Sequence, residues 1–206
     1  MSLLHFFFDS SKKSNPFILD FYTPNRAYSL RKIKKTSEKV IKVRRSSDNQ
    51  ELDIGFLQNR LDIDKIYDFI GSSNAFIAVW YDQSGNNNHL TQTSQNYQPR
   101  IANGGVIDIG PNGLPNIFFD SSRFMRFNYI NIPNVDIFGV LHSKNITSNG
   151  TIVGGENSGC LQYRVSDNSK QSLLKASVAN IGNSSSTLSI DTPYILGSSY
   201  DQFGNW

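Results

Sequence analysis

Cysteine is nearly absent from this chain, which has Cys160 and no other among its 206 residues. A single cysteine cannot close an internal disulfide, so the fold does not depend on an oxidising compartment. We interpret Cys160 as a small apolar side chain, because a reactive thiol requires an electropositive and partly exposed site. Long apolar runs are also absent, and none approaches the roughly 20 residues that a membrane-spanning helix needs. We therefore expect no membrane partner.

The chain has little that resembles a secretion signal or a cofactor motif. The apolar stretch Leu3–Phe8 is short and interrupted by His5, and no basic residue precedes it, unlike a signal peptide. We interpret it as an opening strand or a contact with a partner chain. The three histidines lie far apart without metal-ligand spacing, and there is no P-loop, dinucleotide fingerprint or Ser-His-Asp order. No histidine-bound metal or nucleotide cofactor is expected.

Acidic residues are scarce in one segment. Residues 26–45 contain nine basic residues and one acid, Glu38, so this segment carries about +8 and the remainder about −5 of the net +3. In Val40–Arg45 apolar and basic residues partly alternate, as in a half-buried strand with a cationic face toward water or a partner chain. Nucleic acid is the alternative partner for such a segment. The alternation favours the first interpretation, so we do not expect a nucleic-acid partner.

What the chain does contain favours an all-β fold with one helix. Fourteen Phe and nine Tyr supply large apolar surfaces, and frequent Gly, Asn and Ser supply turns. A helix is predicted over Asp62–Ile70, capped by Asp62 or Asp64 and ended by Gly71. Its apolar face has helical spacing and comprises Ile63, Ile66, Tyr67 and Ile70.

Strands account for most of the remaining pattern. Ser46–Gln50 is predicted to be a turn between two strands, because Asp and Asn side chains there can bond their own backbone. Ala27–Ile33 is predicted to be a short helix or strand. The predicted strands are 41–45, 52–56, 76–81, 100–101, 106–109, 115–119, 124–127, 136–142, 150–153, 160–165, 172–178 and 187–190.

The chain is predicted to form one domain with an appendage. Residues 1–25 form an N-terminal extension or partner-contacting arm, and residues 26–206 form the sandwich. The last segment, Tyr194–Trp206, suggests one strand entering a turn with no returning strand. A sheet that ends in this way leaves an unpaired edge. We expect the domain to be incomplete at its C-terminus, with either more chain or another chain completing the sheet.

The most specific feature is the phrase Val79–Leu90, in which a short apolar strand runs into Asp-Gln-Ser-Gly-Asn-Asn-Asn. We interpret the phrase as a tight turn, with Asp82 and the Asn side chains binding local backbone and Gly85 supplying a positive φ. Calcium is the alternative, and its candidate ligands are Asp82, Ser84, Asn86 and Asn88. The spacing does not match an EF-hand loop.

Two aromatic residues precede this turn. Trp80 and Tyr81 are candidates for stacking on a sugar ring, and the alternative is packing in the core. Residues that alternate along a strand cannot both face inward, so one of the two should meet solvent or a neighbouring sheet.

The phrase resembles one in arabinofuranosidase catalytic domains with a concanavalin A-like (LamG-like) jelly-roll fold, and in bacteriophage and bacterial surface proteins with the same sandwich. Further segments carry the resemblance over roughly residues 20–140: Ala27–Arg31, Ile41–Asn49, Asp53–Gly55, Gln98–Ile101 and Asn116–Asp120. The resemblance implies an all-β, concanavalin A-like jelly-roll sandwich with a short N-terminal extension and one helix.

The resemblance carries over only one candidate catalytic residue. In the enzymes the nucleophile is a Glu in a Gly-Asn-Ala-Glu-like phrase, and Gly154–Asn157 places Glu156 in a similar position. Retaining glycosidases need a second carboxyl about 5–5.5 Å away, and in the enzymes that acid lies beyond where this chain stops. The enzymes' paired cysteines are also missing. We therefore interpret Glu156 as a turn carboxylate and assign no catalytic residue.

These features favour a non-enzymatic bacteriophage virion protein, such as a fibre, tail or capsid-decorating protein. We expect it in the virion, with a bacterial cell surface or secreted location as alternatives. Its partners would be other virion chains, most simply in a homotrimer, and a host-surface glycan. The alternative functions are a glycoside hydrolase related to arabinofuranosidases and a glycan-binding lectin module.

Overall fold

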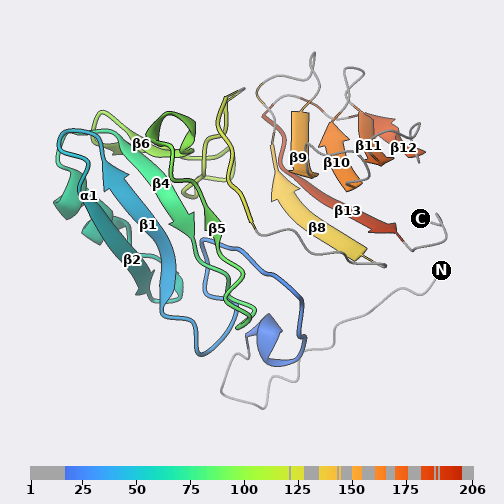
Figure 1. Cartoon of the computed structure of the whole chain (residues 1–206), viewed down its shortest axis with the longest axis horizontal. Helices are drawn as coiled ribbons and strands as arrows, with labels where there is room; N and C mark the ends of the chain where they lie inside the picture. The colour runs from blue at the N-terminus through green and yellow to red at the C-terminus, as the bar shows by residue number, and fades with distance from the viewer. Residues whose placement is uncertain are drawn as a thin grey trace. The chain divides into compact units, whose positions relative to one another are not determined.

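The computed structural model describes residues 17–120, 122–127, 135–142, 144, 150–154, 161–165, 170–175, 182–187, 189 and 191–200. They divide into two compact units (Figure 1). The first contains the described residues up to Ile107 together with Arg123–Phe127, and the second contains the others. Within the described residues, no helix is both long and apolar enough to span a bilayer.

The first unit is built on a seven-stranded sheet in the order β3-β2-β1-β4-β6-β7, with β5 paired to β4. Every pairing is antiparallel. The strands are β1 (Lys39–Arg45), β2 (Glu51–Leu57), β3 (Arg60–Leu61), β4 (Ala75–Trp80), β5 (Leu90–Thr91), β6 (Arg100–Asn103) and β7 (Val106–Ile107).

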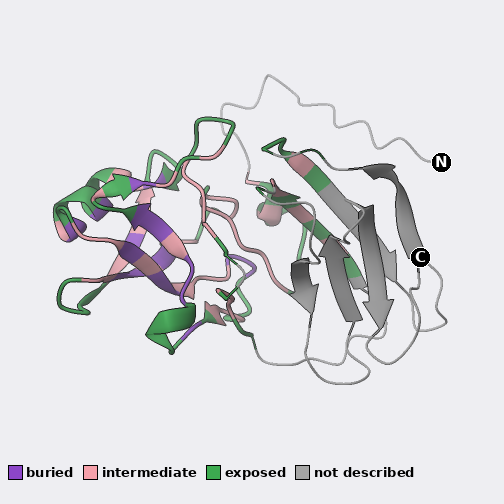
Figure 2. Ribbon diagram, turned by 90° about the horizontal axis from the view of Figure 1, so that it is seen from above, coloured by how far each residue is buried: buried purple, intermediate pink, exposed green. Residues whose placement is uncertain are grey.

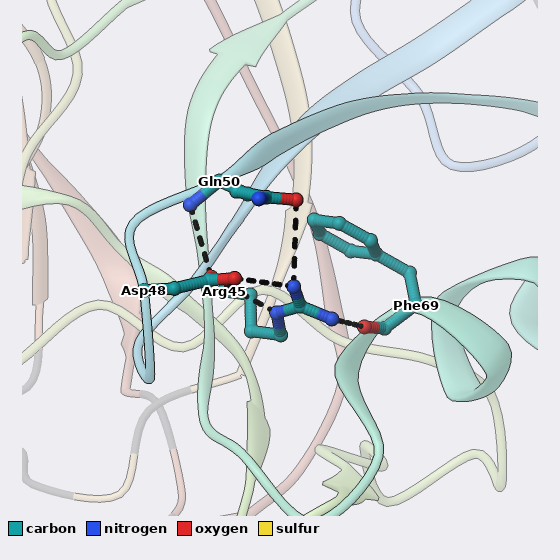
Figure 3. A network of polar contacts seen from close by, with 4 residues as sticks. All are labelled: Arg45, Asp48, Gln50 and Phe69. Atoms are coloured by element: carbon teal, nitrogen blue, oxygen red, sulfur yellow. Dashed lines mark hydrogen bonds and ion pairs between the residues drawn. The ribbon is translucent and has the colours of Figure 1, made fainter.

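The predicted turn at Ser46–Gln50 is confirmed and joins β1 to β2. Figure 3 shows the polar network at this corner. Arg45 Nε donates to Asp48 Oδ1 at 3.0 Å, and the backbone N–H of Gln50 donates to the same oxygen at 3.1 Å. Arg45 Nη1 also donates to the carbonyl of Phe69 at 2.6 Å. The guanidinium of Arg45 therefore binds the last turn of helix α1 (Ile63–Ile70), where carbonyl groups carry partial negative charge.

The predicted helix is confirmed as α1 (Ile63–Ile70). Asp62 is its N-cap and accepts the N–H of Lys65 at 3.1 Å, and Gly71 follows with φ +55°. Ile66 and Ile70 are buried, whereas Tyr67 is exposed, so the buried stripe is narrower than predicted. The helix packs against β1 and β2, and Figure 2 shows the buried segments of this unit along its strands. The buried apolar side chains include Ile41, Val43, Ile54, Ile77 and Ile101.

The second unit contains two antiparallel sheets. In one, β8 (Val135–Leu141) pairs with β13 (Tyr194–Tyr200) at every position of both strands. The other has the order β12-β11-β10-β9 and comprises β9 (Gly150–Gly154), β10 (Leu161–Val165), β11 (Lys170–Lys175) and β12 (Gly182–Thr187). The predicted strand at the C-terminal end is thus confirmed, and β8 is its partner.

Several local predictions were wrong. Residues 27–33 form neither a helix nor a strand but a loop with one bridge, between Arg31 and Arg60. Residues 115–119 and 124–127 contribute only isolated bridges, at Pro115, Phe118 and Arg126. The strand predicted at 187–190 lies earlier, at β12. Leu3–Phe8 and Cys160 lie outside the described residues.

The predicted all-β class with one α-helix is confirmed for the described residues. The division into an extension of residues 1–25 and a sandwich of residues 26–206 stays a prediction. The described end of the extension contacts the first unit: the N–H of Leu19 donates to the carbonyl of Ile33 at 2.9 Å, and that of Lys35 donates to Asp20 Oδ1 at 3.2 Å.

Candidate functional site

Strand β4 ends at Trp80, and the turn that follows is organised by the carboxylate of Asp82. Its Oδ1 accepts the backbone N–H of Ala27 and of Ser84, both at 2.9 Å. Its Oδ2 accepts the Ser84 hydroxyl at 2.6 Å and the N–H of Asn88 at 3.0 Å. Burial raises the pKa of Asp82, but the hydrogen bonds from Ser84, Ala27 and Asn88 outweigh it, so the pKa lies below its usual value.

The predicted tight turn is confirmed for Asp82, which binds Ser84 and Asn88, and for Gly85, but the side chains of Asn86 and Asn88 do not bind local backbone as predicted. Gly85 has φ +97°, which only glycine adopts readily. The side-chain amides of Asn86 and Asn88 donate to the carbonyl of Asn25, each at 3.1 Å, so they bind the backbone of the lead-in segment. The calcium hypothesis stays a prediction, and a cation at Asp82 would have to displace four hydrogen-bond donors.

Gln83 joins the turn to the loop 27–33. Its side chain is buried, with 1% exposure. Its Oε1 accepts the N–H of Ile33 at 2.9 Å, and its Nε2 donates to the carbonyls of Ser29 at 2.9 Å and Arg31 at 3.0 Å. The buried amide of Gln83 therefore provides hydrogen-bond partners for three backbone groups of this loop. In a helix or strand, other backbone groups would provide them.

Trp80 lies against Tyr28, with ring centroids 5.9 Å apart and an interplanar angle of 50°. The Tyr28 hydroxyl donates to the carbonyl of Asn88. Burial, the largest effect, raises the pKa of Tyr28 to about 12, with Arg26 opposing and Asp82 reinforcing that rise. Trp80 Nε1 is buried, and in the described part of the chain it has no hydrogen-bond partner.

Tyr81 points to a different set of neighbours. Its hydroxyl donates to Asp53 Oδ1 at 2.6 Å, and Lys39 Nζ lies 2.6 Å from Asp53 Oδ2. The ring meets His89 edge-on at 4.9 Å, and His89 Nδ1 accepts the N–H of Asp82 at 3.1 Å. Burial and the bond to Asp53 raise the pKa of the Tyr81 hydroxyl. Burial also raises the pKa of Asp53, but the bonds from Lys39 and Tyr81 outweigh it, so that pKa is lowered.

The chemistry available here is that of a rigid scaffold. Asp53 and Asp82 are both held as charged acceptors, which suits them to binding donors and not to releasing protons at neutral pH. The structure brings together Trp80, Tyr81, Asp82 and Asn88, which the sequence had singled out. Their roles in binding sugar or a metal stay predictions. Glu156 lies outside the described residues.

The family model for the catalytic domain of alpha-L-arabinofuranosidase B matches residues 26–113, which include β4 and its turn. The chain resembles this catalytic domain. A solved GH54 α-L-arabinofuranosidase mutant, soaked with 4-nitrophenyl α-L-arabinofuranoside, is similar with a TM-score of 0.51 and 17% identity. The match covers 74% of this chain and 38% of that one, so this chain spans well under half of the solved protein.

A second solved structure is an arabinofuranosidase in complex with arabinofuranosyl-α-1,2-xylobiose. It has a TM-score of 0.44 and 18% identity, over 84% of this chain and 37% of that chain. No curated protein sequence matches the chain. At these identities, the first likeness shows the fold, and it agrees with the predicted concanavalin A-like sandwich.

The expectation of a non-enzymatic virion protein was wrong. The matching model is that of an enzyme's catalytic domain, and the solved structure is an arabinofuranosidase. The likeness to phage proteins is not shown by these comparisons. The prediction failed because one strand-and-turn phrase occurs on a scaffold with two kinds of function.

Sequence reasoning missed two residues that organise the site, Asp53 and Gln83. Asp53 is an ordinary strand residue in the sequence and Gln83 an ordinary turn residue, and their side-chain partners lie 14 to 54 residues away. The resemblance to the catalytic domain was the signal that set the buried Gln83 apart from the other glutamines of the sequence.

Proposed function

We propose that this chain is a glycoside hydrolase module related to arabinofuranosidases, and that it acts on arabinofuranosyl groups. The observation that carries the proposal is the match of residues 26–113 to the arabinofuranosidase B catalytic domain. The turn after β4 lies within that match and is held by an extensive hydrogen-bond network. The likeness to a GH54 enzyme soaked with an aryl arabinofuranoside supports the same substrate group.

Glycoside hydrolysis requires two carboxyl groups, one to attack or activate water and one to protonate the leaving oxygen. Glu156 is the candidate nucleophile, because it occupies the position that the resemblance assigns to it. Asp53 and Asp82 are poor candidates for the proton donor, since each is hydrogen-bonded as a carboxylate with a lowered pKa. The proton donor is therefore neither of these two carboxyl groups.

The test is release of 4-nitrophenol from 4-nitrophenyl α-L-arabinofuranoside by the purified chain and by Glu156→Gln. We expect activity in the wild type and a loss of at least about 10³-fold in the variant. Glu51→Gln is the matched control, because Glu51 lies on β2 beside Lys42, 3.9 Å away, and has no part in the proposed chemistry. An inactive wild type, or equal activity in Glu156→Gln, contradicts the proposal.

Candidate donors beyond the matched segment are tested by changing each acid after residue 113, apart from Glu156, to its amide. The set comprises Asp120, Asp136, Asp167, Asp191 and Asp201. The variant that removes the donor should lose more activity on an alkyl arabinofuranoside than on the 4-nitrophenyl one, because 4-nitrophenolate needs little protonation to leave.

The predicted homo-oligomer, glycan contact and cell-surface or secreted location stay predictions. Light scattering of the purified chain would distinguish a trimer from a monomer.

A further inference from the structure

Two aromatic rings from distant parts of the chain stack on the surface of the first unit. Tyr97, at the end of the 3-10 helix η2 (Gln95–Tyr97), lies 5.3 Å from Phe124 between ring centroids, with an interplanar angle of 30°. Tyr97 is 44% exposed. The guanidinium carbon of Arg126 lies 5.0 Å from the Phe124 centroid. We call Tyr97, Phe124 and Arg126 the aromatic platform.

The backbone beneath the platform is fixed by hydrogen bonds between the two segments. The N–H of Phe124 donates to the carbonyl of Tyr97 at 3.1 Å, and Thr91 and Arg126 exchange two backbone bonds of 2.8 Å. Beneath them, the buried Gln92 donates its side-chain amide to the carbonyl of Phe124 at 3.1 Å. An exposed tyrosine on such a base needs little further ordering to bind a ligand, which lowers the entropy cost of binding.

The neighbouring exposed side chains are neutral and can hydrogen-bond. They are Thr91, Thr93, Gln95 and Asn96. An aromatic face beside hydroxyls, amides and one guanidinium suits a sugar ring, because the C–H face of a sugar packs on the aromatic ring and its hydroxyls bind the polar groups. A phosphate chain instead requires several exposed cations. Arg123, next to Phe124, donates to the carbonyl of Gln98 and lies over the Phe76 ring, which leaves Arg126 as the exposed cation beside the two stacked rings.

We propose that the aromatic platform binds the sugar chain of a neutral polysaccharide. This inference rests on the proposed function and deepens it, because it makes the substrate an arabinofuranosyl-bearing polymer and not a small glycoside. The platform lies wholly within the first unit, whereas Glu156 follows its last residue, Arg126, by 30 positions in the sequence. It therefore serves as a binding subsite, and no catalytic role is assigned to it.

The first experiment measures binding without requiring catalysis. The mobility of the purified chain is followed in native gels that contain soluble arabinoxylan. We expect retardation of the wild type and about tenfold weaker binding for Tyr97→Ala. Tyr97→Phe should retain binding, because it keeps the ring. Tyr67→Ala is the matched control, since Tyr67 is 41% exposed on α1.

The second measurement remains informative if Tyr97→Ala does not fold. Tyrosine rings are labelled with 13C, and Tyr97→Phe identifies the Tyr97 signal. Arabinoxylan oligosaccharides should shift the Tyr97 signal and leave that of Tyr67 unchanged. An unshifted Tyr97 signal, unretarded wild type, or retardation equal in the wild type and Tyr97→Ala overturns the inference. Binding of a single-stranded oligonucleotide at Tyr97, without arabinoxylan binding, also overturns it.

The two proposals can fail separately. If the chain binds arabinoxylan through Tyr97 but does not release 4-nitrophenol, the platform stands and the hydrolase proposal falls. If Glu156-dependent hydrolysis occurs but polysaccharide binding does not depend on Tyr97, only the platform is overturned. In the working enzyme, Tyr97→Ala should raise KM for arabinoxylan and leave kcat/KM for the aryl glycoside unchanged.

Discussion

The backbone N–H of Ala27 donates to Asp82 Oδ1 at 2.9 Å, across 55 residues of sequence. The carbonyl of Ala27 accepts the N–H of Gln83 at 2.7 Å. Both polar groups of one residue are therefore bound by two consecutive residues of the turn after β4. This pairing joins the first residues of the family match to the turn after β4. It supplies hydrogen-bond partners at one end of the loop 27–33, which has no regular secondary structure.

Replacing the carboxylate of Asp82, which accepts the N–H of Ala27, should destabilise the first unit. In Asp82→Asn, an amide group faces either the hydroxyl of Ser84 and the N–H of Asn88 or the N–H groups of Ala27 and Ser84. We expect a loss of about 2–3 kcal/mol in the free energy of unfolding, measured by urea denaturation. Asp68→Asn, at an exposed acid of α1, should change it by less than about 0.5 kcal/mol. Equal effects of the two substitutions would show that Asp82 does not organise the turn.

The same carboxylate predicts an acid-dependent loss of stability. The pKa of Asp82 in the folded chain lies below its ordinary value of 3.8. The stability it provides is therefore complete above pH 3.8 and is lost as the pH falls through the lower, folded-state pKa. The difference in urea midpoint between the wild type and Asp82→Asn should be constant near neutral pH and shrink below about pH 4. A difference that grows on acidification contradicts this assignment.

Gln83→Ala should release the loop 27–33. The substitution leaves the N–H of Ile33 and the carbonyls of Ser29 and Arg31 without their partner. Because Gln83 is buried and its three bonds are partly buried, the expected loss is about 2–3 kcal/mol. Native-state hydrogen exchange should show faster exchange at the Ile33 amide, with little change at Ile77 in β4. Unchanged protection at Ile33 would show that Gln83 does not hold the loop.

The bond between Tyr81 and Asp53 can be measured by a double-mutant cycle. Tyr81→Phe and Asp53→Asn each alter the 2.6 Å bond, and we expect a coupling energy of about 1 kcal/mol. Tyr67→Phe combined with Asp53→Asn is the control cycle, and its two effects should add. Additive effects in the Tyr81 cycle would show that the bond contributes nothing to stability.

The sequence predicted those parts of the fold whose partners are close in the chain. The helix at Asp62–Ile70 and the turn at Ser46–Gln50 follow from capping and side-chain-to-backbone bonds within a few residues. The loop 27–33 was mispredicted because its hydrogen-bond partner is a glutamine about 50 residues away. β12 was misplaced because its polar sequence has little strand character, and its pairing with β11 determines its position.

The candidate site was predicted only in part for the same reason. Trp80, Tyr81 and Asp82 could be recognised as candidates because they are consecutive in the sequence. The aromatic platform could not be recognised, because Tyr97 and Phe124 are 27 positions apart in different segments. Residues 124–127 were predicted as a strand, whereas their backbone makes one bridge, to Thr91. A pairing across this distance has no local signal in a single sequence.

The most direct test of the hydrolase proposal is covalent trapping of the nucleophile. The purified chain is incubated with an arabinofuranoside that carries fluorine at C2 and a reactive leaving group, and the labelled peptide is mapped by mass spectrometry. The account predicts one pentosyl adduct per chain on the peptide that contains Glu156, and none in Glu156→Gln. An unlabelled wild type, or an adduct on another peptide that persists in Glu156→Gln, would contradict it.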